Sequence, residues 1–106
     1  MKLLFSFLLA ATMGLGMTSS NPISKDGTYK GKRLCGEVRI VNSLADFDVR
    51  IVRSLANLNV RFVESNPREI GEWRIVNSGN ADFTIRIVES NPDFTIRIVD
   101  AFPGVQ

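Results

Sequence analysis

Arginine recurs at a nearly constant spacing through most of the sequence, and it is the residue type here that is best suited to binding an anion. The candidate residues are separated by 11, 11, 13, 12 and 11 positions: Arg39, Arg50, Arg61, Arg74, Arg86 and Arg97. A guanidinium group donates several hydrogen bonds in a planar fork that matches phosphate, sulfate and carboxylate. Because equivalent residues on stacked strands lie about 4.8 Å apart, the spacing predicts an anion-binding ladder for a glycan or lipid headgroup.

Acidic residues in the same repeats offer a second interpretation of this surface. The carboxylates of Asp48, Glu64, Asp82, Glu89 and Asp93 are spread among the arginines and can neutralise them. The whole chain has 13 basic and 11 acidic residues, so no large excess of positive charge indicates a nucleic-acid partner. The sequence therefore favours a structural face of ion pairs, with the anion-binding stripe as the alternative.

Catalytic residues are poorly represented. Histidine is absent, which removes the usual general base and the commonest metal ligand. The serines fall in predicted turns, where they have a local hydrogen-bonding role, and the carboxylates recur with the repeat as turn or surface residues. We predict a protein without enzymatic activity, metal or cofactor.

Three other residues with possible chemistry are given structural interpretations. Cys35 is the only cysteine, so an internal disulfide cannot form; we predict that it is buried beside Leu34, with pairing to another molecule as the alternative. Trp73 and Tyr29 are expected to pack in the core or at an edge rather than to stack on nucleic-acid bases.

The elements that must position these side chains are short repeats. The segment DFTIRIV at 82–88 returns unchanged at 93–99, and weaker copies are VRIV at 49–52, VRFV at 60–63 and WRIV at 73–76. Apolar residues fall at every second place and are mostly β-branched or aromatic, as in half-buried strands. Ser-Asn and Asn-Pro steps between the copies are typical of turns. The period therefore predicts short strands about eleven residues apart.

This alternation also predicts the core. The arginines lie on one face of each strand and the large apolar residues on the other. The predicted core residues are Phe47, Ile51, Phe62, Trp73, Phe83, Ile87, Phe94 and Ile98.

An all-β fold is expected, and two arrangements of its strands are compatible with the alternation. An antiparallel meander would leave the apolar stripe wet on a single sheet, whereas a compact two-layer β-coil with about two repeats per turn buries it, so we favour the coil. The repeats form two groups, 38–65 and 73–101, and the segment SNPREIGE at 65–72 is interpreted as a reversal or crossover between them. Stacking of the identical strands into fibres is a third possibility, which the central arginines oppose.

The N-terminal twenty residues differ from the rest. Lys2, an apolar run over 3–9 and small residues up to Met17 are typical of a secretory signal peptide, with an uncleaved anchor as the alternative. We therefore predict a signal peptide at 1–20, an irregular lead-in at 21–33 and a single β-repeat domain at 34–106. The mature protein is expected to be secreted or periplasmic, without a transmembrane segment.

The repeats and turns resemble those of the septoil-knot family. The resemblance rests on SLAD at 43–46, SLAN at 54–57, GEWRIV at 71–76 and SNPD at 90–93, and it covers about residues 34–104. It implies a small all-β domain whose two halves wind around one another into a seven-crossing torus knot. The family carries no assigned activity, so the resemblance transfers no functional residue.

The two interpretations of the arginines differ in a measurable outcome. If they bind anionic polymers, the protein will be retained on an anionic resin at low salt and released as salt rises, because salt screens exposed charges. An Arg50→Gln, Arg86→Gln double variant would then lose retention. Absence of wild-type binding at low salt would exclude the anion-binding interpretation.

Overall fold

The computed structural model describes residues 21–106, which contain β-strands and no helix; the predicted signal peptide at 1–20 lies outside the described residues. The strands are β3 (Thr28–Tyr29), β4 (Lys32–Arg33), β5 (Gly36–Ile40), β6 (Phe47–Ile51), β7 (Leu58–Phe62), β8 (Glu72–Ile75), β9 (Phe83–Ile87), β10 (Phe94–Ile98) and β11 (Gly104–Val105). The all-β fold and the short strands predicted from the repeats are confirmed.

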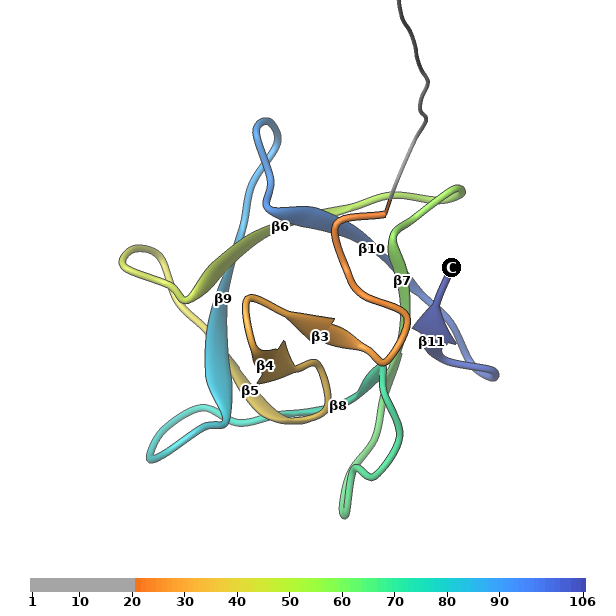
Figure 1. Ribbon diagram of the computed structural model, residues 1–106. Coiled ribbons are helices and arrows are strands. Elements are labelled where there is room, and N and C mark those ends of the chain that lie inside the picture. Colours follow the sequence, from red (N-terminus) through yellow and green to blue (C-terminus); the bar gives the residue numbers. More distant parts are fainter. Residues whose placement is uncertain (1–20) are drawn as a thin grey trace, which may run out of the picture.

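Six of these strands form a closed parallel ring (Figure 1). The order around it is β5, β9, β6, β10, β7 and β8, and the pairing of β8 with β5 closes the circle. The short strand β11 pairs antiparallel with the beginning of β7. Most of the apolar stripe is therefore buried because one sheet closes on itself.

The two repeat groups alternate around the ring. Each of β5, β6 and β7 is flanked on both sides by strands of the second group, β8, β9 and β10. Consecutive strands within a group are two places apart, so the coil takes three strands per turn and not about two. The segment at 63–71 moves the chain by one place only, from β7 to β8. Because of this single step, each strand of the second group lies between two strands of the first group. The segment is a crossover without reversal, since the strands stay parallel.

A constant register relates each strand to its neighbours. Phe47 at the first position of β6 lies opposite Ile85 at the third position of β9, and the same two-residue offset recurs at all six steps. With about 3.3 Å per residue and about 4.8 Å between strands, this offset tilts the strands by about 54° from the barrel axis. The tilt is steeper than the roughly 35–45° of most barrels.

Equal offsets at every step place equivalent repeat positions at one height along the axis, so the inward side chains form three layers. The first contains Gly36, Phe47, Leu58, Gly71, Phe83 and Phe94, and the second Val38, Val49, Val60, Trp73, Ile85 and Ile96. The third contains Ile40, Ile51, Phe62, Ile75, Ile87 and Ile98. The first two layers are buried and form the core.

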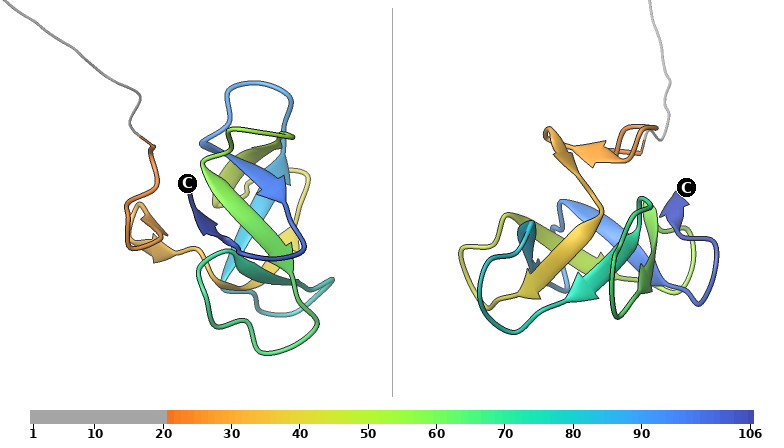
Figure 2. Two further views of the ribbon diagram at one scale, coloured as in Figure 1. Left: turned by 90° about the vertical axis from the view of Figure 1, so that its right-hand side faces the viewer. Right: turned by 90° about the horizontal axis from the view of Figure 1, so that it is seen from below.

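The lead-in covers the first layer. Its strands β3 and β4 form a short hairpin, so residues 21–33 are not wholly irregular, and the right-hand view of Figure 2 shows this hairpin over one end of the barrel. The ring of Tyr29 packs edge-on against Phe47 and Phe94, with centroids 5.3 Å away in each case. Ile23 and Leu34 are buried in the same cluster. One end of the barrel is thereby closed.

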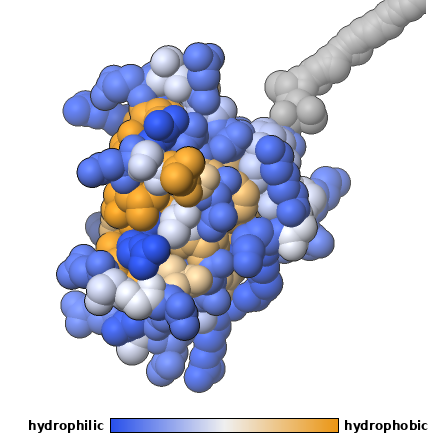
Figure 3. Space-filling model, turned by 90° about the vertical axis from the view of Figure 1, so that its left-hand side faces the viewer, coloured by the Kyte–Doolittle hydropathy of each residue, from blue (hydrophilic) through white to orange (hydrophobic). Residues whose placement is uncertain are grey.

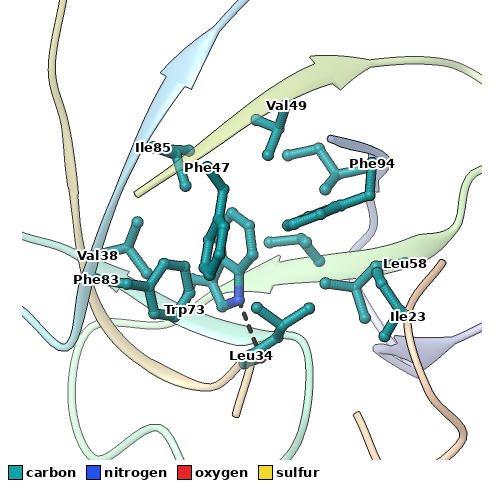
Figure 4. Packing of buried hydrophobic residues seen from close by; sticks show 12 residues of the cluster. Ile23, Leu34, Val38, Phe47, Val49, Leu58, Trp73, Phe83, Ile85 and Phe94 are labelled. Carbon is teal, nitrogen blue, oxygen red and sulfur yellow. Dashed lines mark hydrogen bonds between the residues drawn. The ribbon is translucent and has the colours of Figure 1, made fainter. Parts of the chain in front are cut away.

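The largest core side chain, Trp73, occupies space that two glycines leave open. Gly36 is the first residue of β5 and Gly71 directly precedes the neighbouring strand β8, and neither contributes a side chain to the first layer. The indole of Trp73 packs edge-on against Phe83, with 5.4 Å between centroids, and its Nε1–H donates to the carbonyl of Leu34 at 3.1 Å (Figure 4). The only polar atom of this side chain is satisfied, as burial requires.

The predicted core is half correct. Phe47, Trp73, Phe83 and Phe94 are buried as expected. The other four, Ile51, Phe62, Ile87 and Ile98, were predicted wrongly, because they are 50%, 47%, 42% and 39% exposed. They belong to the third layer, at the end of the barrel that the lead-in does not reach, and the described residues leave this end open.

The backbone at Gly71 is expected to tolerate no side chain. Both Gly71 and Gly79 have positive φ, 91° and 80°, but a Cβ at Gly71 would lie 2.4 Å from the carbonyl oxygen of Asn59, whereas nothing approaches Gly79. Alanine at either site lowers the free energy of unfolding by roughly 1–2 kcal/mol, because a residue with a Cβ is strained at positive φ. At Gly71 the steric clash lowers it by roughly 1–3 kcal/mol more. Urea denaturation should therefore show a clearly larger loss for Gly71→Ala than for Gly79→Ala. Equal losses would contradict the close approach of β7 and β8.

Candidate functional site

The six arginines form a belt around the barrel and not a ladder of stacked charges. Each occupies the fourth position of its repeat, so all six face outward at one height. The register places each opposite a second-position residue of the neighbouring strand, such as Asp48 opposite Arg86 or Thr95 opposite Arg50. Arginines on neighbouring strands are therefore about 8 Å apart at Cα instead of about 4.8 Å. The stacked ladder was predicted wrongly, because the sequence pattern contains no information on strand offset.

Three belt arginines form ion pairs with second-position carboxylates. These pairs are Arg86 with Asp48 at 2.9 Å, Arg74 with Glu37 at 2.7 Å and Arg61 with Glu72 at 3.4 Å. Arg86 binds both carboxylate oxygens of Asp48, and this hydrogen bonding raises the pKa of its guanidinium. The pairs are partly exposed and screened by solvent, so each contributes little to the stability of the fold. Half of the belt is thus neutralised locally.

The remaining belt arginines have no ion pair among residues 21–106. Arg39 donates to the carbonyl of Gly79 at 2.7 Å. Arg50 and Arg97 are exposed and lie on the neighbouring strands β6 and β10, opposite the uncharged residues Thr95 and Asn59. The guanidinium groups of Arg50 and Arg97 are therefore the two in the belt most available to an external anion.

The acidic residues that end the turns cap strands and do not neutralise arginines. Asp82 accepts a hydrogen bond from the backbone N–H of Glu37, and Asp93 accepts one from the N–H of Asp48, both at 2.7 Å. Asp46 and Asn57 bind Thr84 and Thr95 in the same way. Our expectation that Asp82 and Asp93 balance the arginines is therefore wrong. Backbone N–H groups compete for these carboxylates because the turn brings them within reach.

All six turns share one conformation with a positive φ at the residue after Ser or Ala. The residues in this conformation are Leu44, Leu55, Asn66, Gly79, Asn91 and Phe102. Gly and Asn adopt it readily, whereas Leu and Phe do so at a cost. Leu44, Leu55 and Phe102 are also almost fully exposed, so neither backbone preference nor burial explains these three side chains.

The open end of the barrel is the functional feature that sequence reasoning missed. It consists of the third-layer residues Ile40, Ile51, Phe62, Ile75, Ile87 and Ile98, and the arginine belt lies one position before them. Figure 3 shows hydrophobic surface gathered at one end of the molecule. A usable signal was the length of the lead-in, because the 13 residues at 21–33 can cover one end of a barrel but not both. We call this surface the open apolar end.

Reactive side chains do not gather elsewhere in the described part of the chain. No group of three or more His, Cys, Asp or Glu residues is positioned to hold a metal within residues 21–106. Cys35 is buried, as predicted, and burial raises the pKa of its thiol, so the reactive thiolate is disfavoured. Residues 21–106 also contain no helix long and apolar enough to cross a membrane. The surfaces suited to binding are the open apolar end and the arginine belt.

The fold defines a class of protein, an all-β closed barrel of parallel strands in which two halves of the chain alternate. A family model described as the 7(1) septoil knot domain matches residues 31–106. The chain therefore belongs to the septoil knot domain family, which confirms the resemblance seen in the turn and strand motifs. No curated protein matches the sequence.

Acid should weaken the fold in part through Glu72. The backbone N–H groups of Arg68 and Glu69 donate to its carboxylate at 2.9 and 3.1 Å and hold its pKa below the usual range, and the charge of Arg61 adds to the effect. Folding therefore favours the charged form of the Glu72 carboxyl group. The resulting stabilisation of the folded state is present above the ordinary glutamate pKa of about 4.3 and is lost as the pH falls below that value.

We expect Glu72→Gln to lower the urea midpoint at pH 7 and to reduce its further fall between pH 5 and pH 3. Glu69→Gln is the matched control, since the Glu69 side chain is exposed and has no ion pair among the described residues. A wild-type pH slope in Glu72→Gln would contradict this role.

Proposed function

We propose that this protein is an exported, non-catalytic interaction module that binds a macromolecular partner through the open apolar end. The observation that carries the proposal is the exposure of five large apolar side chains, which the register brings to one height at one end of the barrel. Exposed apolar patches of this kind on a folded domain commonly mark binding sites.

The rest of the described molecule supports a scaffold role. No polar or charged residue is buried within residues 21–106, and the turn carboxylates are used to cap neighbouring strands. The serines lie in turns and the chain has no histidine to activate one. The charged side chains that catalysis would need are thus engaged in structure or dispersed on the surface.

The N-terminal sequence supports export. A lysine followed by an apolar run and then by small residues is the pattern that secretion machinery recognises. A barrel closed by backbone hydrogen bonds needs no disulfide, which suits a chain with a single buried cysteine. We propose a secreted or periplasmic location for residues 21–106.

Binding of anionic envelope polymers is a second candidate, favoured by the exposed pair Arg50 and Arg97. Arg86 is paired with Asp48, whereas Arg97 lies opposite the uncharged Asn59. The loss of retention on anionic resin is therefore expected from substitution of Arg97 instead of Arg86. Loss of retention on anionic resin in Arg50→Gln, Arg97→Gln, but not in the paired-residue control Arg74→Gln, Arg86→Gln, would support it. Strand stacking into fibres is less favoured, because a closed ring leaves its six strands no free edge.

Contact through the open apolar end can be tested by photo-crosslinking in the native cell. Phe62 is replaced by a photo-reactive benzophenone analogue of phenylalanine, and the same analogue at the exposed loop residue Phe102 is the control. We expect crosslinked adducts from position 62 in clear excess over position 102, because a bound partner covers the open end. Equal or absent adducts at the two positions would contradict the proposed function.

A further inference from the structure

We infer that the partner at the open apolar end is a second copy of this chain, which forms an end-to-end dimer about a two-fold axis. This inference rests on the proposed function, because it names the occupant of the same surface. It is carried by the area of the apolar layer, by the charges around it and by the closure of the opposite end.

The exposed area fits the centre of a dimer interface. Large apolar side chains offer about 150–200 Å² each, so five that are about half exposed present roughly 400 Å² of contiguous apolar surface. A stable interface of standard size covers about 800 Å² per partner, with an apolar centre and a polar rim. The third layer can supply this centre, while the valines and turn residues that follow the strands supply the rim.

The charges at this end favour a second copy over an anionic surface. Four arginines there lack an ion pair among residues 21–106: Arg39, Arg50, Arg97 and, directly after the valine that follows β6, Arg53. Three acidic residues occupy the equivalent place after β7, β9 and β10 and also lack one: Glu64, Glu89 and Asp100. An anionic membrane or polymer would meet these carboxylates with repulsion. A second copy presents both signs and can pair them across the interface.

The fold also limits association to two copies. All six strands are parallel, so each contributes the last apolar residue of its stripe to the same end. The opposite end is covered by the lead-in, which leaves one apolar end per molecule. A two-fold axis pairs the two open ends and leaves no further apolar end for growth. The apolar layer would provide affinity, and the unequal charges would select one rotation among six nearly equivalent ones.

The dimer can be tested by sedimentation velocity of the purified full chain. Concentrations between about 1 and 100 µM are suitable, because they bracket a micromolar Kd. We expect the wild type to sediment as a dimer in the upper part of this range and Ile51→Gln, Ile98→Gln to weaken association at least tenfold. The matched control is Leu44→Gln, Leu55→Gln, which removes two exposed apolar side chains from the turns. It should dimerise like the wild type. A monomeric wild type at 100 µM, or unchanged association in the isoleucine variant, would overturn the inference.

A charge exchange across the interface tests the inference independently, in case the isoleucine variant does not fold. Arg50→Glu, Arg97→Glu should be folded by circular dichroism and largely monomeric, as should Glu64→Arg, Glu89→Arg, and a mixture of the two should restore the dimer. Failure of the mixture to dimerise while each variant still self-associates would contradict pairing across the open end. Vesicles containing anionic lipid that bind the monomeric wild type, but not the isoleucine variant, would assign the surface to a membrane instead.

These outcomes separate the inference from the proposed function. Crosslinks from position 62 to other proteins, with a monomeric wild type, would end the dimer inference and leave the interaction role intact. Absence of crosslinks from position 62 would contradict both.

Discussion

The two-residue offset between neighbouring strands is the constraint on which the rest of the structure depends. It recurs at each of the six steps of the ring, so it sets the steep tilt of the strands and brings equivalent repeat positions to one height. Backbone hydrogen bonds enforce it, and the valine after each strand extends the pattern, as when the N–H of Val88 donates to the carbonyl of Val49 at 2.9 Å. Three layers of inward side chains follow from this register alone.

The same offset determines the chemistry of the outer surface. It places a second-position side chain between each pair of arginines, so like charges avoid direct opposition and three arginines obtain an acidic partner. It also brings the last residue of four turns to a backbone N–H of a neighbouring strand, where Asp46, Asn57, Asp82 and Asp93 act as caps. Turn residues that look like free surface charges therefore belong to the hydrogen-bonding system of the barrel.

The two ends of the barrel differ because only one is covered by the chain. Tyr29 and Ile23 from the lead-in, with Leu34 directly after it, pack over the first layer, while the third layer has no equivalent cover among the described residues. Removing an apolar side chain from water stabilises a protein by roughly 1.5–3 kcal/mol. The half-exposed third layer therefore lacks a sizeable part of the stabilisation that full burial would give. A partner that covers this layer would recover it, which gives the open apolar end its tendency to associate.

The sequence by itself determined the strands, their phase and the family, because alternation of side chains and turn residues are local properties of the chain. Phe47, Phe83 and Phe94 were therefore correctly assigned to the core, and the motifs at 43–46 and 90–93 indicated the fold. The tertiary structure alone decided the register, the alternation of the two halves and the end at which the stripe is left open. Ile51 and Ile87 have the same local pattern as buried residues, and only their height in the ring exposes them. Strand offset and end coverage depend on contacts between residues far apart in the chain, and a pattern of neighbours along the sequence does not contain them.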